Sequence, residues 1–318
     1  MLDRRSLNLR IRMKWSQGTQ RVATVCGGGC PDPSGDNSFC PSLLKLPTTL
    51  AMSEHTSRTD FALELAEKAQ EFILQHFRSQ TLGVESKDDA SPVTVADKGA
   101  ERLIRDGLAE RFPDDGILGE EYDDVEGKNG YRWILDPIDG TKPFIHGVPL
   151  FGTLIGIEFE GRMVAGVCRF PALDEVVYAT EGEGAWWKIG KLDPVPAKAS
   201  TETDLSNSRL MFTEPTSDRE CGRDHVVPEM MSKVRMARGW GDCYGHMMVA
   251  TGRAEISVDP RMSPWDIAAL LPIVRESGAS CTDWQGNESI FNGDGVSIAP
   301  ALVGEVLPML KDVPKLTK

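Results

Sequence analysis

Long apolar runs and aromatic side chains are both scarce in this chain of 318 residues. Because no stretch of about eighteen consecutive apolar residues occurs, the sequence predicts no membrane-spanning helix and no membrane partner. Phe, Trp and Tyr make up only 7% of the residues, but hydrophobic residues reach 40%, which is ordinary for a soluble α/β enzyme. The length is sufficient for two packed subdomains.

Cysteine is also sparse, and its odd, scattered distribution without a secretory signal indicates reduced thiols. The seven cysteines are Cys26, Cys30, Cys40, Cys168, Cys221, Cys243 and Cys281. The first three do not have the spacing of a zinc finger or ribbon, so we expect no zinc site there. The histidines form no His-x-x-x-His pair, and no Cys, His or Ser stands in a nucleophile motif, so we expect no covalent intermediate.

Basic residues are in the minority, and the net charge is −13 at pH 7. Residues 1–51 carry seven Lys and Arg against three Asp and Glu, whereas residues 52–318 carry 28 against 45. The resulting negative field disfavours binding to nucleic acid and would attract metal cations or a cationic substrate group. General solubility explains the same charge without any ligand, so both interpretations stay open.

The first 51 residues are basic and rich in Gly, Pro, Ser and Thr. Three explanations stay open: a targeting segment such as a plastid transit peptide, a disordered extension, or upstream sequence included by a wrong start codon, with Met52 as the true start. We favour the third. We expect an N-terminal α+β subdomain over residues 52–188, with most metal ligands, and a C-terminal α/β subdomain over residues 189–318. We expect a cytoplasmic location, or a plastid one if residues 1–51 are a transit peptide.

Hydrophobic periodicity predicts two helices followed by an antiparallel sheet. A core-facing helix is expected over residues 60–77, capped by Thr59 or Asp60, and a second over residues 95–112, ended by Pro113. The expected strands of the sheet are 152–159, 164–170, 176–180 and 184–188. Beyond residue 190 the pattern is mixed, with strands expected near 210, near 234 and over 254–258, and helices over 218–232, 243–251, 265–277 and 302–310.

The most informative segment is Asp136-Pro137-Ile138-Asp139-Gly140-Thr141, which places two carboxylates and a hydroxyl in one short stretch after the apolar run 131–135. We expect a tight turn, in which Pro137 holds Asp136 extended and Gly140 lets the backbone approach a ligand before a helix begins. Exposed N–H groups at a helix start suit a phosphate, and neighbouring carboxylates suit a hard metal ion. The segment therefore favours metal-assisted phosphoryl transfer over an ordinary Asx turn. Its acids are three residues apart, which disfavours the aspartyl-phosphate route of phosphatases with an Asp-x-Asp motif.

Two further acidic clusters fit such a site: Gly119-Glu120-Glu121 upstream and Trp265-Asp266-Ile267-Ala268-Ala269 downstream. In this order the three motifs resemble the inositol monophosphatase superfamily of Mg²⁺-dependent, lithium-sensitive phosphatases, over roughly residues 59–310. The stretch 136–155 and the segment Trp240-Gly241-Asp242-Cys243-Tyr244 are similar to its histidinol-phosphate phosphatase branch.

The resemblance implies an α+β fold, a layered α-β-α-β-α sandwich of the inositol monophosphatase and fructose bisphosphatase type, and a homodimer. It implies two or three Mg²⁺ ions, with Mn²⁺ as an alternative and Li⁺ as an inhibitor. The expected metal ligands all offer oxygen: Glu120, Asp136 and the Ile138 carbonyl for the first ion, and Asp136, Asp139 and Asp266 for the second. Lys87, in a polar loop, would help to order a third ion. An N-cap on the following helix is the alternative role of Asp266.

Hydrolysis by a metal-activated water needs a group that orients the water and a base. Thr141 is the candidate for orientation, and Glu120 or Asp97 is the candidate base. Asp97 lies in a segment that resembles the family's source of a further acid, and helix capping is its alternative role. The Gly140 and Thr141 amides would bind the phosphoryl oxygens.

Substrate recognition is expected from Gly241, Asp242, Cys243 and Asp259. Asp242 stands where inositol phosphatases usually have a small neutral loop, and its carboxylate suits the ammonium or imidazole of histidinol phosphate. Capping of the next helix is its alternative role. Asp259 lies seven residues before Asp266, where the family carries a sugar-contacting acid.

We therefore expect hydrolysis of L-histidinol phosphate, a small-molecule substrate, to L-histidinol in histidine biosynthesis. The alternative substrate is inositol-1-phosphate or another small phosphate. A non-catalytic protein-binding scaffold of the same fold is the alternative from a different class, and the complete set of metal ligands argues against it.

Overall fold

The computed structural model of the protein describes residues 49–79, 84–86, 92–213 and 222–315. Contacts between Cα atoms divide the chain into two units, Met1–Lys45 and Leu46–Lys318, and all described residues belong to the second. Lys87, expected to help order a third metal ion, lies outside the described residues. The expected division of the chain at residues 51 and 188 stays a prediction.

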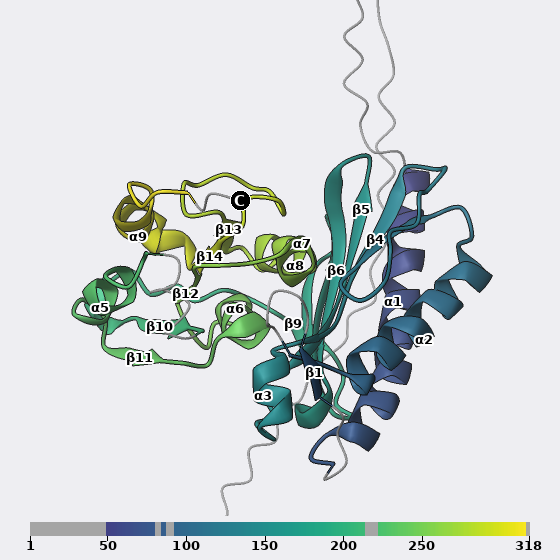
Figure 1. The fold of residues 1–318 in the computed structure, drawn as a ribbon. Coiled ribbons are helices and arrows are strands. Elements are labelled where there is room, and N and C mark those ends of the chain that lie inside the picture. Colours follow the sequence, from purple (N-terminus) through teal and green to yellow (C-terminus); the bar gives the residue numbers. More distant parts are fainter. Residues whose placement is uncertain (1–48, 80–83, 87–91, 214–221, 316–318) are drawn as a thin grey trace, which may run out of the picture. The chain divides into compact units, whose positions relative to one another are not determined.

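Two sheets form the framework of the second unit (Figure 1). The larger sheet contains, in this order across the sheet, β3 (Gly116–Gly119), β4 (Tyr131–Asp139), β5 (Gly152–Phe159), β6 (Arg162–Phe170), β7 (Glu175–Thr180), β8 (Gly184–Ile189) and β9 (Val195–Pro196). The smaller contains, in this order, β11 (Met236–Arg238), β10 (Arg209–Phe212), β12 (Ile256–Asp259), β14 (Gly295–Ile298) and β13 (Ser280–Thr282). β3 and β4 are parallel, as are β10 with β11 and β10 with β12, and the other pairs are antiparallel. A separate hairpin joins β1 (Val84–Ser86) and β2 (Pro92–Thr94).

Helices cover both faces of each sheet. They are α1 (Thr49–His76), α2 (Val95–Arg111), α3 (Thr141–Ile145), α5 (Val226–Met231), α6 (Asp242–Ala250), α7 (Pro264–Ala268), α8 (Leu270–Glu276) and α9 (Val303–Leu310), with short 3₁₀ helices η1 (Pro171–Leu173), η2 (Leu205–Asn207) and η3 (Pro300–Leu302). α1 and α2 pack on one face of the larger sheet, α6, α7 and α8 lie between the sheets, and α5 and α9 cover the outer face of the smaller sheet (Figure 1). The predicted α-β-α-β-α sandwich is therefore confirmed.

The helix predicted over 95–112 and the four strands predicted between 152 and 188 end within two residues of their expected bounds. The first helix was placed too late: α1 begins at Thr49, and Thr59 does not cap it, because its hydroxyl donates to the His55 carbonyl inside the helix (3.0 Å). The helix predicted over 265–277 is divided into α7 and α8. Pro272 has no N–H to donate to the Ala268 carbonyl, which accounts for the break one turn earlier. β1, β2, β3, β4, β9, β13 and β14 were not predicted as strands. Of the helix expected over 218–232, residues 218–221 lie outside the described residues, and α5 covers only Val226–Met231 of the rest.

The segment 136–141 does not form the expected tight turn. Its first four residues are the end of β4, Gly140 follows, and Thr141 begins α3. Pairing with β5 runs to Asp136 opposite Leu154 and resumes only at Asp139, so the strand is irregular between them. Pro137 lies in this irregularity, where a missing N–H breaks no ladder bond. Gly140 follows with φ +84°, a left-handed conformation that favours glycine, and α3 begins directly after it.

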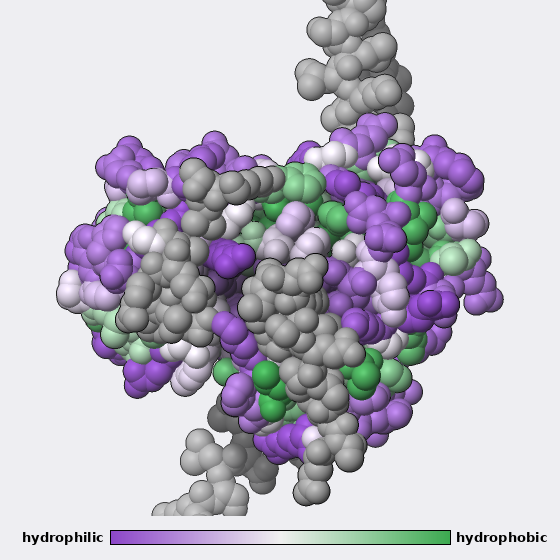
Figure 2. Space-filling model, in the orientation of Figure 1, coloured by the Kyte–Doolittle hydropathy of each residue, from purple (hydrophilic) through white to green (hydrophobic). Residues whose placement is uncertain are grey.

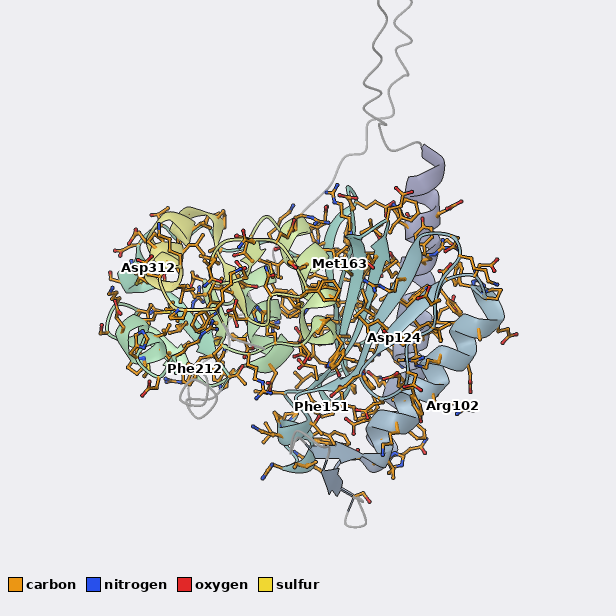
Figure 3. The ribbon with its side chains drawn as sticks, turned by 45° about the horizontal axis from the view of Figure 1, so that its top comes forward. Arg102, Asp124, Phe151, Met163, Phe212 and Asp312 are labelled. Carbon is orange, nitrogen blue, oxygen red and sulfur yellow. The ribbon has the colours of Figure 1, made fainter. Side chains whose placement is uncertain are left out.

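Two glycines on β5 and β6 let α7 and α8 approach the larger sheet closely. Gly156 and Gly166 are paired across these strands. A Cβ on Gly166 would overlap the carbonyl oxygen of Ala269, and one on Gly156 would lie 2.8 Å from the Ala268 Cβ. Met163 fills the space beside this contact, at the junction of helices and sheet in Figure 3. The close approach brings the first turn of α7 down onto β4 and β5.

The surface seen in Figure 2 is mainly hydrophilic, and hydrophobic residues appear on it only in small patches. Among the described residues, no helix has both the length and the apolar character that crossing a membrane requires.

Replacing Gly166 with Ala is expected to reduce the free energy of unfolding by about 1–3 kcal/mol, because the added methyl group overlaps backbone that cannot swing away. Denaturant unfolding measures this loss. Gly304→Ala in α9 is the matched control, since nothing lies within 4 Å of its Cβ position and Ala favours a helix by up to about 1 kcal/mol. Equal stability of Gly166→Ala and the unmodified protein would contradict the close approach.

Candidate active site

Three of the predicted metal ligands meet although the last is far from the others in sequence. Carboxylate oxygens of Asp136, Asp139 and Asp266 lie within 4.8 Å of one another. The first two belong to the end of β4, and Asp266 lies in the first turn of α7. The close packing of α7 on the larger sheet thus assembles an acidic cluster at this end of β4.

The buried, mutually repelling carboxylates of this cluster would be stabilised by a cation. Burial, followed by the charges of Glu120, Asp139 and Asp266, raises the pKa of Asp136 well above its ordinary value. Burial and the charges of Glu120 and Asp259 likewise raise the pKa of Asp266 to about 7. Asp136 Oδ1 is buried and has no hydrogen-bond partner among the described residues. A group of buried carboxylate oxygens with a free acceptor fits a hard divalent cation, which would remove the repulsion.

Two carboxylates of the cluster, those of Asp139 and Asp266, each accept a hydrogen bond from a backbone N–H. Asp139 Oδ2 accepts the Cys243 N–H at 2.6 Å, and Asp266 Oδ2 accepts the Ser263 N–H at 2.7 Å. Ser263 is the N-cap of α7, and Asp266, the third residue of the helix, completes a capping box with it. The alternative role of Asp266 as the N-cap itself is therefore wrong. Pro264 occupies the first helical position and shifts the cap three residues earlier than expected.

Glu120 follows β3 in a loop that α2 holds in place. The Glu101 carboxylate, which is fully buried, accepts the Glu121 N–H at 2.9 Å and pairs with Arg105 at 2.7 Å. Arg105 in turn donates to the carbonyls of Tyr122 and Asp123 at 3.0 and 2.9 Å. Sequence reasoning missed this clamp, because an acid and an arginine four residues apart on a helix usually form only a surface pair.

Asp97 lies on the same side of the cluster and also caps α2. Its Oδ2 accepts both the N–H and the hydroxyl of Thr94, at 2.8 and 2.6 Å, in a second capping box. Burial raises the pKa of Asp97, the two hydrogen bonds lower it, and the charge of Glu120 raises it further. The capping role is confirmed, and the role as a base stays a prediction. Thr141 donates its hydroxyl to the Ile138 carbonyl at 3.2 Å.

Of the residues predicted to recognise the substrate, Gly241, Asp242 and Cys243 lie at the start of α6, and Asp259 is the last residue of β12. The Asp242 N–H donates to Thr213 Oγ1 at 3.1 Å, and that hydroxyl donates to Asp259 Oδ1 at 2.6 Å. Gly241 is required here, since a Cβ would overlap the Thr213 backbone. The Asp242 carboxylate lies beside Gly140, with Oδ2 3.2 Å from the position that a Cβ would take there. Thr213 had no signal in the sequence that could have found it.

Asp242 also has a φ of +51°, which an aspartate adopts at some cost in free energy. Burial, followed by the charge of Asp242, raises the pKa of Asp139 well above its ordinary value. Asp242 therefore adds a further negative charge next to the predicted metal ligands, in a strained backbone conformation of the kind that functional sites retain.

Cys243 contributes its backbone to the cluster. Its side chain is buried, and burial raises the pKa of the thiol well above its ordinary value, so the thiol stays protonated. A protonated, buried thiol agrees with the expected absence of a cysteine nucleophile. A substrate contact by Cys243 stays a prediction.

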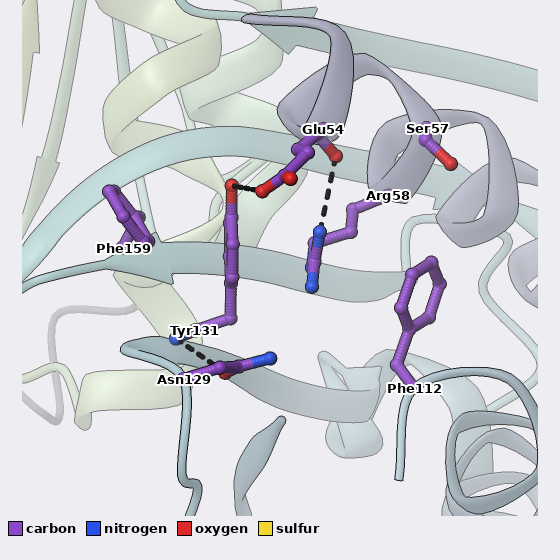
Figure 4. Close-up of a pocket in the computed structure, with 7 residues that line it drawn as sticks. All are labelled: Glu54, Ser57, Arg58, Phe112, Asn129, Tyr131 and Phe159. Carbon is purple, nitrogen blue, oxygen red and sulfur yellow. Dashed lines mark hydrogen bonds between the residues drawn. The ribbon is translucent and has the colours of Figure 1, made fainter. Parts of the chain in front are cut away.

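A separate cavity of about 660 Å³ lies at the other end of β4 (Figure 4). Its lining residues are Glu54, Ser57, Arg58, Phe112, Asn129, Tyr131 and Phe159. The Arg58 guanidinium lies 3.4 Å from the Tyr131 ring centroid and 4.6 Å from that of Phe112, and its charge is matched by Asp115 at 2.8 Å. Tyr131 is five residues, or roughly 17 Å, from Asp136 along the strand. This cavity is therefore not part of the acidic cluster.

The five-layer fold and its acidic cluster are those of a phosphoric monoester hydrolase. The family model described as "Inositol monophosphatase family" matches residues 54–313. The chain therefore belongs to the inositol monophosphatase family, which implies dependence on divalent metal ions and action on a small phosphate substrate.

Individual relatives agree with this assignment. The chain is 48% identical to a histidinol-phosphatase from Chlorobaculum parvum over 252 residues, which are 79% of this chain and 95% of that protein. It is 34% identical to a histidinol-phosphatase from Mycobacterium tuberculosis over 249 residues, which are 78% of this chain and 96% of that protein. The solved structure of an IMPase from Thermotoga maritima matches with a TM-score of 0.71 and 30% identity, over 81% of this chain and 98% of that one. The resemblance to the superfamily and to its histidinol-phosphatase branch is confirmed.

Replacing Asp139 with Asn is expected to reduce turnover by about 100-fold or more, because a metal ligand loses its charge. Mg²⁺ should no longer raise the melting temperature of this variant. Without metal, the variant should be at least as stable as the unmodified protein without metal, since one repelling carboxylate is gone. Phosphate release and thermal unfolding, each with Mg²⁺ and with EDTA, measure both effects. Asp312→Asn, at an exposed position, is the control. Full turnover by Asp139→Asn would contradict the assignment of this ligand.

Arg105→Ala is expected to raise the Mg²⁺ concentration needed for half-maximal thermal stabilisation by about tenfold, because the loop that carries Glu120 loses its clamp. Arg102→Ala is the matched control on the same helix, where an exposed pair with Asp106 is worth little. If both variants respond to Mg²⁺ alike, the clamp does not position Glu120.

Proposed function

We propose that the protein hydrolyses L-histidinol phosphate to L-histidinol and phosphate, as a step of histidine biosynthesis. The observation that carries this proposal is the presence of two acids, Asp242 and Asp259, beside the acidic cluster: the Thr213 hydroxyl donates to the Asp259 carboxylate and accepts the Asp242 N–H. Neither belongs to the expected metal ligands, and the negative charge at both positions would attract a substrate that carries an ammonium or imidazolium group. Inositol phosphate offers only hydroxyls at this place, which gain less from a carboxylate. The two histidinol-phosphatases among the relatives support the same substrate.

We propose Mg²⁺ as the metal, in two or three sites, with Mn²⁺ as a substitute and Li⁺ as an inhibitor. The residues that would hold the ions are Glu120, Asp136, Ile138 through its carbonyl, Asp139 and Asp266. When bound, the ions would neutralise phosphate charge and make a water acidic enough to attack. A homodimer and a cytoplasmic location, or a plastid one if residues 1–51 are a transit peptide, belong to the proposal on the family resemblance alone.

The side chains and amides of the protein would do the rest of the chemistry. The Gly140 and Thr141 amides at the start of α3 would bind phosphoryl oxygens, because the first N–H groups of a helix have no preceding turn whose carbonyls could accept them. The Thr141 hydroxyl would orient the attacking water. Asp97 or Glu120 would accept its proton, and in Asp97 only Oδ1 is left for this task, since Oδ2 accepts both bonds from Thr94.

Inositol-1-phosphate is the second candidate substrate, favoured by the structural match to the Thermotoga enzyme. Phosphate release with Mg²⁺, compared between L-histidinol phosphate and inositol-1-phosphate and repeated with EDTA, decides between them. Preference for inositol-1-phosphate would keep the metal site and overturn the proposed substrate. Absence of EDTA-sensitive release from both would overturn the proposed function.

Asp242→Asn is expected to raise the KM for L-histidinol phosphate by about 10- to 100-fold and to leave the KM for inositol-1-phosphate within about threefold, because only the first substrate loses an ionic contact. Asn tolerates a positive φ, so the backbone is not disturbed. Asp224→Asn, at an exposed position, is the control. An equal rise of KM for both substrates would contradict the cation-binding role.

A further inference from the structure

The inner face of the smaller sheet, which packs against α6, carries polar residues where an apolar face would be expected. Side chains alternate along β12, so Ile256 and Val258 enter the outer hydrophobic core while Ser257 and Asp259 face α6. Ser297 lies opposite Ser257 on β14 and faces the same way. All of these residues are buried. A row of buried polar groups on a sheet face needs partners, because each unpaired group costs free energy.

His246 of α6 is the partner that covers this row. It is fully buried, and its Nδ1 lies 2.8 Å from Ser297 Oγ. Its Nε2 is directed at Asp259 Oδ2 at 3.6 Å and has no hydrogen-bond partner among the described residues. A distance of 3.6 Å is too long for a hydrogen bond, but a shift of about half an ångström would close it.

We infer that His246 is a positioning residue for substrate recognition: it accepts the Ser297 hydroxyl at Nδ1 and directs an Nε2–H at Asp259, which fixes the Asp259 carboxylate towards the cationic group of the substrate. This inference rests on the proposed function. Thr213 donates to the other oxygen of Asp259, so that closing the contact from Nε2 would give both oxygens a donor and fix the plane of the carboxylate. Through Thr213 the same network reaches the Asp242 backbone.

A neutral imidazole suits this task better than a basic side chain. An Arg or Lys in its place would form an ion pair with Asp259 and cancel the charge that the substrate needs. A neutral N–H orients the carboxylate and leaves its charge in place. The long Nε2 to Oδ2 distance fits a contact that closes when the substrate cation draws Asp259 into place, as contacts in ligand-free sites often tighten on binding.

Two amide substitutions separate the two nitrogens of His246. In His246→Gln the amide nitrogen takes the place of Nε2 and keeps a donor for Asp259. In His246→Asn the shorter amide reaches Ser297 only. With L-histidinol phosphate we expect KM to rise about tenfold in His246→Asn and less than about threefold in His246→Gln, with kcat changed by less than about twofold in both. Ser257→Ala is the matched control, a buried polar residue under α6 whose hydroxyl has no partner among the described residues.

Melting temperatures with Mg²⁺ identify a variant that does not fold. An equal rise of KM in His246→Asn and His246→Gln, or no rise in either, would overturn the inference. A fall in kcat at constant KM would also overturn it.

A second measurement does not depend on the substrate. Nitrogen-15 NMR of the imidazole, with the His246 signal assigned from the His246→Asn spectrum, reports which ring nitrogen carries the hydrogen. The Nε2–H form is expected, and an Nδ1–H form would overturn the inference whatever the enzyme hydrolyses. Failure of the unmodified protein to release phosphate from L-histidinol phosphate would instead overturn the proposed function and leave the NMR result to decide the role of His246.

Discussion

Repulsion between buried carboxylates is the constraint on which the rest of this structure depends. Asp136, Asp139 and Asp266 are held together, and their burial, followed by the charges of neighbouring carboxylates, raises their pKa values. Such a group stays assembled only if rigid elements fix each member and if a cation can join them. The strand end, the capping box of α7 and the Cys243 N–H of α6 each hold one part of it.

The layers of the fold supply that rigidity. α6, α7 and α8 are enclosed between two sheets, so the two helix starts that reach the cluster cannot move away from it separately. Gly156 and Gly166 let α7 come close enough for Asp266 to meet β4. On the far side, Glu101 and Arg105 fix the loop after β3 from within α2. Residues that never touch a ligand thus decide whether the ligands meet.

Local patterns in the sequence predicted most of the larger sheet, because its hairpins join neighbouring strands and alternate regularly. The expected metal ligands also follow from motifs, and three of them are found together. The division of α7 from α8 and the true cap of α7 were missed, since hydrophobic periodicity registers neither the N–H that Pro272 lacks nor the preference of Pro264 for the first helical position. The contacts of Thr213 and His246 could not be predicted, because their partners lie on strands and helices that only the tertiary fold brings together.

The bond from the Cys243 N–H to the Asp139 carboxylate joins the start of α6 to the acidic cluster, and α6 contributes only a backbone group to it. Side chains at positions 242 and 243 can therefore change without disturbing that bond, provided that the backbone keeps its conformation. Enzymes built on this plan could exchange one substrate for another by substitutions in a single short segment, while the hydrolytic apparatus is inherited intact. Within such a lineage, we would then expect the preferred substrate to change more often than the reaction that is catalysed.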